Sequence, residues 1–181
     1  ISIRGSGKTW NAILGDDANL GVSSEAASFL QAPLIFAGYG LKIPEANWDD
    51  LDGLPLRGAV VVYLRGGPSS IAGNLRSHYS STQERWKALK AAGAVGMIGI
   101  ANPQHMDVPW SRISAARLMP RMTLADETLG DTAGLQFSAS WNPAKAHELF
   151  DSTPYPFAQI LEEANHDQPL PHFAMKLQIR A

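Results

Sequence analysis

The stretch that decides the fold is residues 59–101, which read AVVVYLRGGPSSIAGNLRSHYSSTQERWKALKAAGAVGMIGIA. It begins with Ala59–Leu64, a continuous, mostly β-branched run typical of a strand buried on both faces. It ends with a second apolar run, Val95–Ala101. A strand, a helix and a strand in this order predict a right-handed crossover. We therefore expect two parallel strands side by side, with the helix on one face of the sheet.

The helix of this unit has a recognisable start and end. Residues 81–84 read STQE, the Ser-x-x-Glu form of a capping box, so the helix is expected to begin there. Gly93 is expected to end it, because glycine best tolerates the left-handed conformation at a helix C-terminus. The spacing places Trp86 and Leu89 on the inner face and Arg85 outside.

The polar segment of greatest functional interest is residues 65–81, which read RGGPSSIAGNLRSHYSS and are predicted to form a loop. It leaves the carboxyl end of a buried parallel strand, where open α/β sheets bind their ligands. Arg76, His78 and Tyr79 are large, polar and grouped within it. One interpretation is a solvated loop. The other is a surface that faces a substrate or a partner domain, with these three residues as the substrate-facing candidates.

The rest of the chain predicts a mixed α/β (α+β) fold with more strand than helix, and 181 residues fit one domain. Residues 15–24 are expected to form a polar loop. The other expected elements are strands at 1–4 and 9–14 joined by a turn at 5–7, strands at 34–39, 135–141 and 173–180, and helices at 142–150 and 156–164.

Composition excludes several classes of function. Lys and Arg total 15 against 17 Asp and Glu, so no cationic field is available for nucleic acid. Cysteine is absent, which excludes disulfides and thiolate zinc sites. The longest uncharged apolar run, Ala91–Ala101, is too short for a membrane span of about 20 residues. Because the first residue is Ile1 rather than Met, the chain is expected to be a piece of a longer one.

Three short motifs partly match phosphate-binding or metal-binding sites, but each is better explained as a turn or a surface segment. The sequence GSGKT at residues 5–9 lacks the first glycine of a phosphate-binding loop, where Ser2 stands, and is read as a hairpin turn. His105 and Asp107 have a His-x-Asp spacing but lie in a predicted surface loop. His147 and Glu148 match the start of the helical zinc motif His-Glu-x-x-His, but Asp151 stands where that motif has its second histidine. No catalytic residue and no metal ligand is predicted in this segment.

Two parts of the chain resemble the protease-associated (PA) domain. The sequence LRG at residues 64–66 and AAGAVGMI at 91–98 match its signature, an Arg-Gly after a buried strand and a helix ending in Ala-Gly-Ala-x-Gly-Val-Ile. The sequences FAGYG at 36–40 and WDD at 48–50 are similar to the version inserted in bacterial zinc aminopeptidases of the glutamate carboxypeptidase and aminopeptidase Y type. The resemblance covers about residues 25–180.

The resemblance implies a structural signature made of Arg65, Gly66, Gly93 and Gly96. Gly93 and Gly96 let the helix end close against the sheet, and Gly66 turns the chain away from the first strand. The implied architecture is a β-sandwich or open barrel with peripheral helices around the 59–101 unit. The whole chain, 1–181, is then a single PA domain excised from a longer zinc peptidase.

The function implied by the resemblance is non-catalytic. A PA domain of a zinc-dependent aminopeptidase covers the active-site entrance and shapes substrate access or recognition. Its partners are the peptidase domain of the same chain and the peptide substrate. It has no cofactor of its own, since zinc is bound by the peptidase domain, and the protein is periplasmic or secreted. The alternative is a free-standing peptide- or protein-interaction module.

Two residues depart from the family pattern. Arg85 stands where the wider family often has lysine, and Ala59 follows Gly58 where lysine is usual. Both departures are expected at exposed or edge positions.

Overall fold

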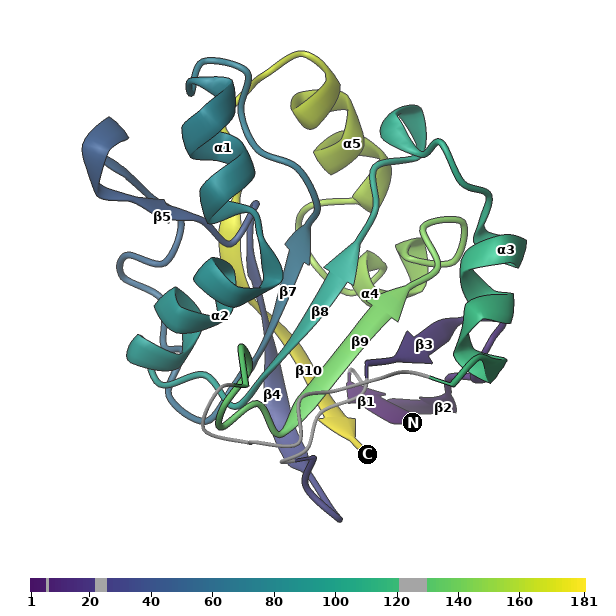
Figure 1. Cartoon of the computed structure of the whole chain (residues 1–181). Helices are drawn as coiled ribbons and strands as arrows, with labels where there is room; N and C mark the ends of the chain where they lie inside the picture. The colour runs from purple at the N-terminus through teal and green to yellow at the C-terminus, as the bar shows by residue number, and fades with distance from the viewer. Residues whose placement is uncertain (6, 22–25, 121–129) are drawn as a thin grey trace.

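A computed structural model describes residues 1–5, 7–21, 26–120 and 130–181. Its main feature is a curled eight-stranded sheet flanked by helices (Figure 1). A separate two-stranded hairpin projects beside it. In spatial order the sheet contains β2 (Lys8–Asn11), β1 (Ser2–Gly5), β10 (His172–Arg180), β4 (Gln31–Ala37), β7 (Val60–Leu64), β8 (Gly96–Ile100), β9 (Phe137–Trp141) and β3 (Ala18–Leu20), and the hairpin contains β5 (Lys42–Ile43) and β6 (Trp48–Asp49).

The centre of the sheet is parallel and its flanks are antiparallel. Strands β4, β7, β8 and β9 pair in parallel, while β10, β1 and β2 continue the sheet antiparallel on one side and β3 does so on the other. The predicted pairing of the two strands in residues 59–101 is confirmed, with Val60 opposite Gly96. The mixed α/β class is confirmed as well, and the curled sheet agrees with the expected open barrel.

Helices lie on both faces of the sheet and at the end toward which β7 and β8 point (Figure 1). In this view α2 lies in front of the sheet, α1 and α5 lie at its upper end, and α3 lies beside β3. The helices are α1 (Gly73–Tyr79), α2 (Thr82–Ala91), α3 (Trp110–Ala115), α4 (His147–Phe150) and α5 (Phe157–Asn165). Among the described residues, none of the helices has the length and apolar character needed to cross a bilayer.

Strand β7 contributes to two hydrophobic cores, one on each face. Val60, Val62 and Leu64 belong to the core that contains residues of α4 and α5, whereas Val61 and Tyr63 belong to the core under α2. All five side chains are at most 5% exposed. Burial on both faces explains why this strand reads as a continuous apolar run rather than an alternating one.

Helix α2 begins and ends where the sequence predicts. The Oγ of Ser81 accepts a hydrogen bond from the backbone N of Glu84 at 3.3 Å, which is the cap. Trp86 and Leu89 are buried on its inner face. After the helix, Gly93 adopts a φ of +91°, in the left-handed region that favours glycine.

The expectation that Arg85 and Ala59 lie at exposed or edge positions is wrong, because both are buried and Ala59 adjoins β7, an inner strand of the sheet. Arg85 is only 4% exposed, and Ala59 is fully buried. The Arg85 guanidinium carbon lies 4.3 Å from the centre of the Tyr63 ring, and its Nε and Nη1 donate to the carbonyls of Tyr39 and Ser80. Burial lowers the pKa of Arg85. Two backbone carbonyls and an aromatic face replace part of the water around the cation, whereas its Nη2 has no hydrogen-bond partner among the described residues.

The prediction of a loop over residues 65–81 is also wrong, because this segment contains α1. The helical bonds run from the N of Arg76 to the carbonyl of Ala72 and from the N of Ser80 to the carbonyl of Arg76. Ile71 and Leu75 pack against the larger core. Tertiary packing of these two apolar residues stabilises a helix that the local Gly and Ser content disfavours.

Two other expectations are corrected, and the remaining elements are confirmed within three residues at each end. The predicted loop at 15–24 contains β3, and its residues 22–24 lie outside the described part of the chain. The helix expected from residue 142 begins only at His147, after turns in which the Asn142 side chain accepts from the N of Ala144 at 3.1 Å. The turn expected at 5–7 joins β1 to β2, although its residue 6 is not described.

Candidate functional site

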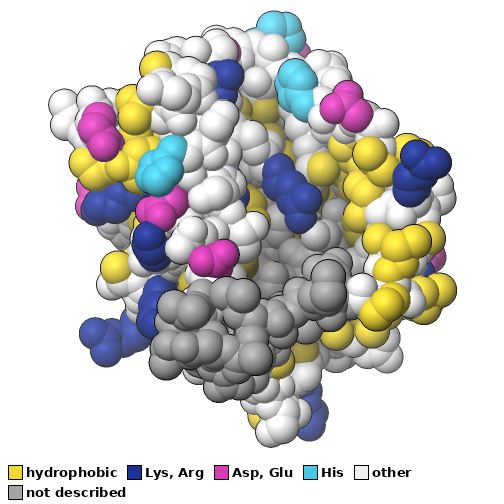
Figure 2. Space-filling model, viewed as in Figure 1, with side chains coloured by type: hydrophobic (Ala, Val, Ile, Leu, Met, Phe, Trp, Pro, Cys, Tyr) yellow, Lys and Arg dark blue, Asp and Glu magenta, His cyan; other side chains and the backbone are white. Residues whose placement is uncertain are grey.

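An open cleft of about 600 Å³ lies on one face of the sheet, between α2 and α3. We call it the arginine cleft. Figure 2 shows this face of the molecule hollowed between the helices, with basic side chains at the hollow. The residues of the cleft used below are Asn19, Tyr63, Arg65, Arg112, Arg117, Ser138 and Ser140.

The floor of the cleft is made of small and polar residues on adjacent strands. The strand registers align Tyr63 of β7 with Gly99 of β8, Gly99 with Ser140 of β9, and Ser140 with Asn19 of β3. A Cβ on Gly99 would lie 2.9 Å from the Nε of Arg65 and 2.9 Å from the Oη of Tyr63. The absence of a side chain on β8 therefore lets these two groups extend over the sheet.

Three arginines give the cleft its charge. Arg65 follows β7 and its Nη2 donates to the Oγ of Ser140 at 2.6 Å. Arg112 lies on α3, and the Nη1 of Arg117 donates to the carbonyl of Ser114 at 2.7 Å. None of the three arginines makes an ion pair with a described residue, and no Asp or Glu is among the described lining residues. The described lining of the cleft therefore carries a positive charge.

Helix α3 is held in place by bonds to distant parts of the chain. The indole N of Trp110 donates to the carbonyl of Gly15 at 3.1 Å, and the Ser114 hydroxyl donates to the same carbonyl. Asn19, only 8% exposed, donates from Nδ2 to the carbonyl of Ile113 at 3.2 Å. Its Oδ1 has no partner among the described residues, and a buried amide oxygen of this kind favours a ligand that donates a hydrogen bond.

The chemistry of the cleft suits the anionic group of a ligand. Guanidinium groups bind carboxylate and phosphate oxygens through paired, charge-assisted hydrogen bonds. The hydroxyls of Ser138 and Ser140 add uncharged donors on the floor. The volume is within the usual range for small ligands and peptide side chains.

The three predicted substrate-facing residues lie on α1, outside the described lining of the arginine cleft. Arg76 donates from Nη1 to the carbonyl of Pro68 at 3.0 Å. Tyr79 donates to the carboxylate of Glu45 at 2.8 Å, and this bond raises the pKa of Tyr79. His78 packs edge-on against Tyr79, with the ring centres 4.9 Å apart. Whether these residues face a substrate stays a prediction.

The signature residues serve different purposes. Gly66 has a φ of +111°, and a Cβ on Gly96 would lie 2.7 Å from the carbonyl oxygen of Phe137, so these glycines are required by the backbone. Arg65 instead places a cation in the cleft. The other two arginines follow much later in the sequence, and no local motif distinguishes them, which is why sequence reasoning missed the site.

The predicted surface pair His105 and Asp107 is exposed. Over the part of the chain that the structure describes, no three His, Cys, Asp or Glu side chains come together as a set that could hold a metal ion.

A second polar cluster lies at the end of β4, around the buried side chains of Asp50 and Tyr39. Asp50, 2% exposed, accepts a hydrogen bond from the N of Leu41 at 3.0 Å, and the Nε2 of His172 lies 3.3 Å from its other oxygen. Burial, followed by the negative charges of Asp167 and Asp50, raises the pKa of Tyr39 to about 12. This cluster joins the β5–β6 hairpin to β10 and stabilises the fold.

Comparison with known proteins identifies a solved structure with a similar fold. No protein-family model matches the chain, and no curated protein matches it. Among solved structures, the chain is similar to an aminopeptidase from Aneurinibacillus sp. strain AM-1, with a TM-score of 0.42 and 12% identity. The match covers 99% of this chain and 32% of that one, so the chain spans about a third of the length of that protein.

Proposed function

We propose that this chain is a non-catalytic PA domain of a zinc-dependent aminopeptidase, and that its arginine cleft binds the anionic end of a peptide substrate. In this proposal the domain covers the active-site entrance and shapes which peptides reach it. The zinc ligands belong to a peptidase domain on the same polypeptide, and the protein works in the periplasm or outside the cell.

The observation that carries the proposal is the position of Arg65. It is the arginine of the Arg-Gly signature, and it lies on the floor of the cleft with Arg112 and Arg117, where no Asp or Glu is among the described lining residues. Arg65 therefore belongs both to the residues that carry the resemblance and to those that could bind a ligand. A carboxylate is the anionic group that every unmodified peptide offers.

Arg76, His78 and Tyr79 are proposed as a second surface that faces the substrate from α1.

The proposal is tested by the kinetics of the full-length enzyme on two tripeptides, one with a free C-terminal carboxylate and one with a carboxamide. Replacing Arg112 by Gln removes a charge-assisted contact, which is expected to lower kcat/KM for the free carboxylate by about tenfold or more. The carboxamide should be hydrolysed at the wild-type rate. Arg57→Gln, an exposed arginine outside the described cleft lining, is the matched control.

Zinc content measured on the same variants separates recognition from metal loss. Equal effects on the carboxylate and the carboxamide would contradict carboxylate recognition by the cleft. Wild-type kinetics in both Arg76→Ala and His78→Ala would remove α1 from the substrate-facing surface. Hydrolysis of aminoacyl chromogenic substrates by the purified 181-residue chain would overturn the non-catalytic assignment.

A further inference from the structure

Strand β2 lies at one edge of the sheet, and among the described strands it pairs only with β1. In antiparallel pairs, residues alternate between those that hydrogen-bond to the partner and those that do not. The N of Ala12 donates to the carbonyl of Ile1 at 2.7 Å, which fixes the alternation. Lys8 and Trp10 therefore bond to β1, whereas the N–H and C=O groups of Thr9 and Asn11 point to the open side.

A groove of about 450 Å³ lies on one face of this edge. Lys8 and Trp10 of β2 form one side, and Glu148 and Asp151, from α4 and the residue after it, form the other. Neither carboxylate makes an ion pair with a described residue. The described groove thus holds two carboxylates against one lysine, a net negative charge, beside the outward backbone groups of Thr9 and Asn11.

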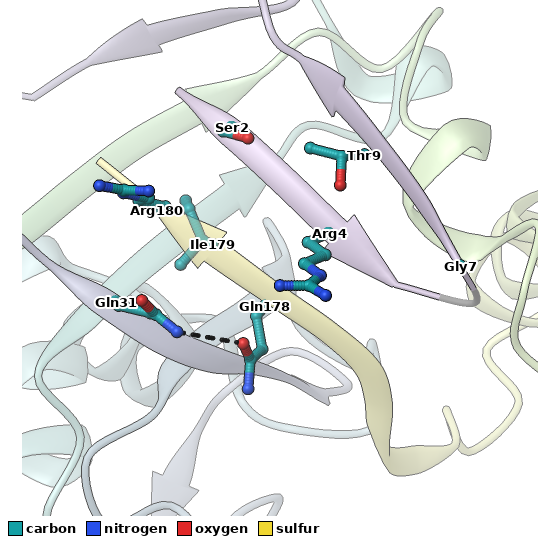
Figure 3. A pocket seen from close by; sticks show the side chains of 8 residues that line it. All are labelled: Ser2, Arg4, Gly7, Thr9, Gln31, Gln178, Ile179 and Arg180. Carbon is teal, nitrogen blue, oxygen red and sulfur yellow. Dashed lines mark hydrogen bonds between the residues drawn. The ribbon is translucent and has the colours of Figure 1, made fainter.

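The opposite face of the same edge has a different character. Figure 3 shows Thr9 beside Arg4 and Ser2 in a shallow polar groove of about 320 Å³. Arg4 is directly opposite Thr9 in the register of β1 and β2. No Asp or Glu is among the described residues of this groove. The two faces of β2 thus differ in charge, one acidic and one basic.

We propose that β2 binds an extended peptide as an added strand, with a Lys or Arg side chain of that peptide between Glu148 and Asp151. The free groups of Thr9 and Asn11 would supply the backbone hydrogen bonds, as in other cases of strand addition. Successive side chains of a strand point to opposite faces. Basic side chains at every second position therefore reach the acidic groove, and the intervening positions, which face Arg4, are polar or acidic.

This inference does not depend on the proposed function, because it concerns another edge of the sheet and another ligand charge. A peptide is favoured over a second copy of this chain by charge complementarity. The groove holds two carboxylates and is matched best by a peptide with basic side chains at alternate positions, whereas a second β2 would add only one lysine, followed two residues later by Trp10. Association of two copies is accordingly an outcome that the test must distinguish.

The test uses the peptide acetyl-Thr-Lys-Thr-Lys-Thr-Val-amide, titrated into the chain while backbone amide resonances are followed by NMR. The expected result is saturable shifts at Thr9 and Asn11. Glu148→Gln/Asp151→Asn should weaken binding roughly threefold to tenfold, as expected for exposed ion pairs. Glu162→Gln/Asp52→Asn, which removes two carboxylates outside the groove, should leave it unchanged.

Backbone pairing is tested separately. Thr9→Pro removes one outward N–H, which an edge strand tolerates, and is expected to weaken binding at least fivefold. A peptide N-methylated at alternate residues should bind as weakly to the unaltered chain, so the result does not depend on folding of the proline variant. Equal binding of the glutamate analogue, acetyl-Thr-Glu-Thr-Glu-Thr-Val-amide, would overturn the proposal. Shifts at Thr9 and Asn11 that follow protein concentration without peptide would also overturn it in favour of a second copy.

Discussion

Replacing Gly96 by Ala tests the packing of the crossover unit most directly. A Cβ at this position would lie 2.7 Å from the carbonyl oxygen of Phe137 and 2.9 Å from its Cβ, with Val60 Cγ2 at 3.1 Å. The obstacles are the backbone of β9 and the side chain of a buried β7 residue, and neither can turn away. Strands β8 and β9 must therefore separate locally to accommodate one methyl group.

The expected loss of stability follows from two opposing effects. Overpacking of this kind costs about 1–3 kcal/mol. Replacing glycine by alanine also lowers the entropy of the unfolded chain, which stabilises the fold by about 0.4–1 kcal/mol. The net free energy of unfolding should fall by about 1–2 kcal/mol. In a chain of this size this corresponds to a decrease in Tm of about 2–8 °C.

The assay is urea and thermal unfolding followed by circular dichroism, with two matched variants. Gly73→Ala at the start of α1 meets no atom within 4 Å, so it should be neutral or slightly stabilising. Gly99→Ala meets the ends of the Arg65 and Tyr63 side chains, so it should cost less stability than Gly96→Ala but weaken carboxylate binding in the cleft. Equal stability of Gly96→Ala and Gly73→Ala would refute the packing explanation.

Three further outcomes are expected. The pKa of Tyr39, about 12 against an ordinary value of 10, means that the folded state holds this proton more tightly than the unfolded chain does. The stability that this proton contributes is complete below pH 10 and is lost as the pH rises toward 12, by at most about 3 kcal/mol. Urea unfolding at pH 9 and 11 should therefore show a smaller loss of stability in Tyr39→Phe. Asp50→Ala leaves the N–H of Leu41 without its acceptor and should lower the free energy of unfolding by about 1–3 kcal/mol, whereas Asp50→Asn, which keeps an oxygen there, should lose less in the same assay. Ser81→Ala removes the cap of α2 and should cost about 1 kcal/mol in chemical denaturation, with exposed Ser77→Ala unchanged.

Local sequence determined the parts of this protein in which neighbouring residues specify the conformation. The crossover unit could be predicted because Ala59–Leu64 is long enough to be buried on both faces and because Ser81 and Gly93 define the helix between the strands. The glycines of the signature could be predicted for the same reason, since each is required by a turn or by a close backbone approach.

Only the tertiary structure decided features that depend on contacts between distant residues. Helix α1 forms because Ile71 and Leu75 find a core to pack against, and Arg85 is buried because Tyr39, Ser80 and Tyr63 surround it. The arginine cleft likewise joins side chains from several separate segments of the chain, the first at Asn19 and the last at Ser140. Sequence patterns report the periodicity of one segment, whereas a binding site arises where strand order and register bring separate segments together.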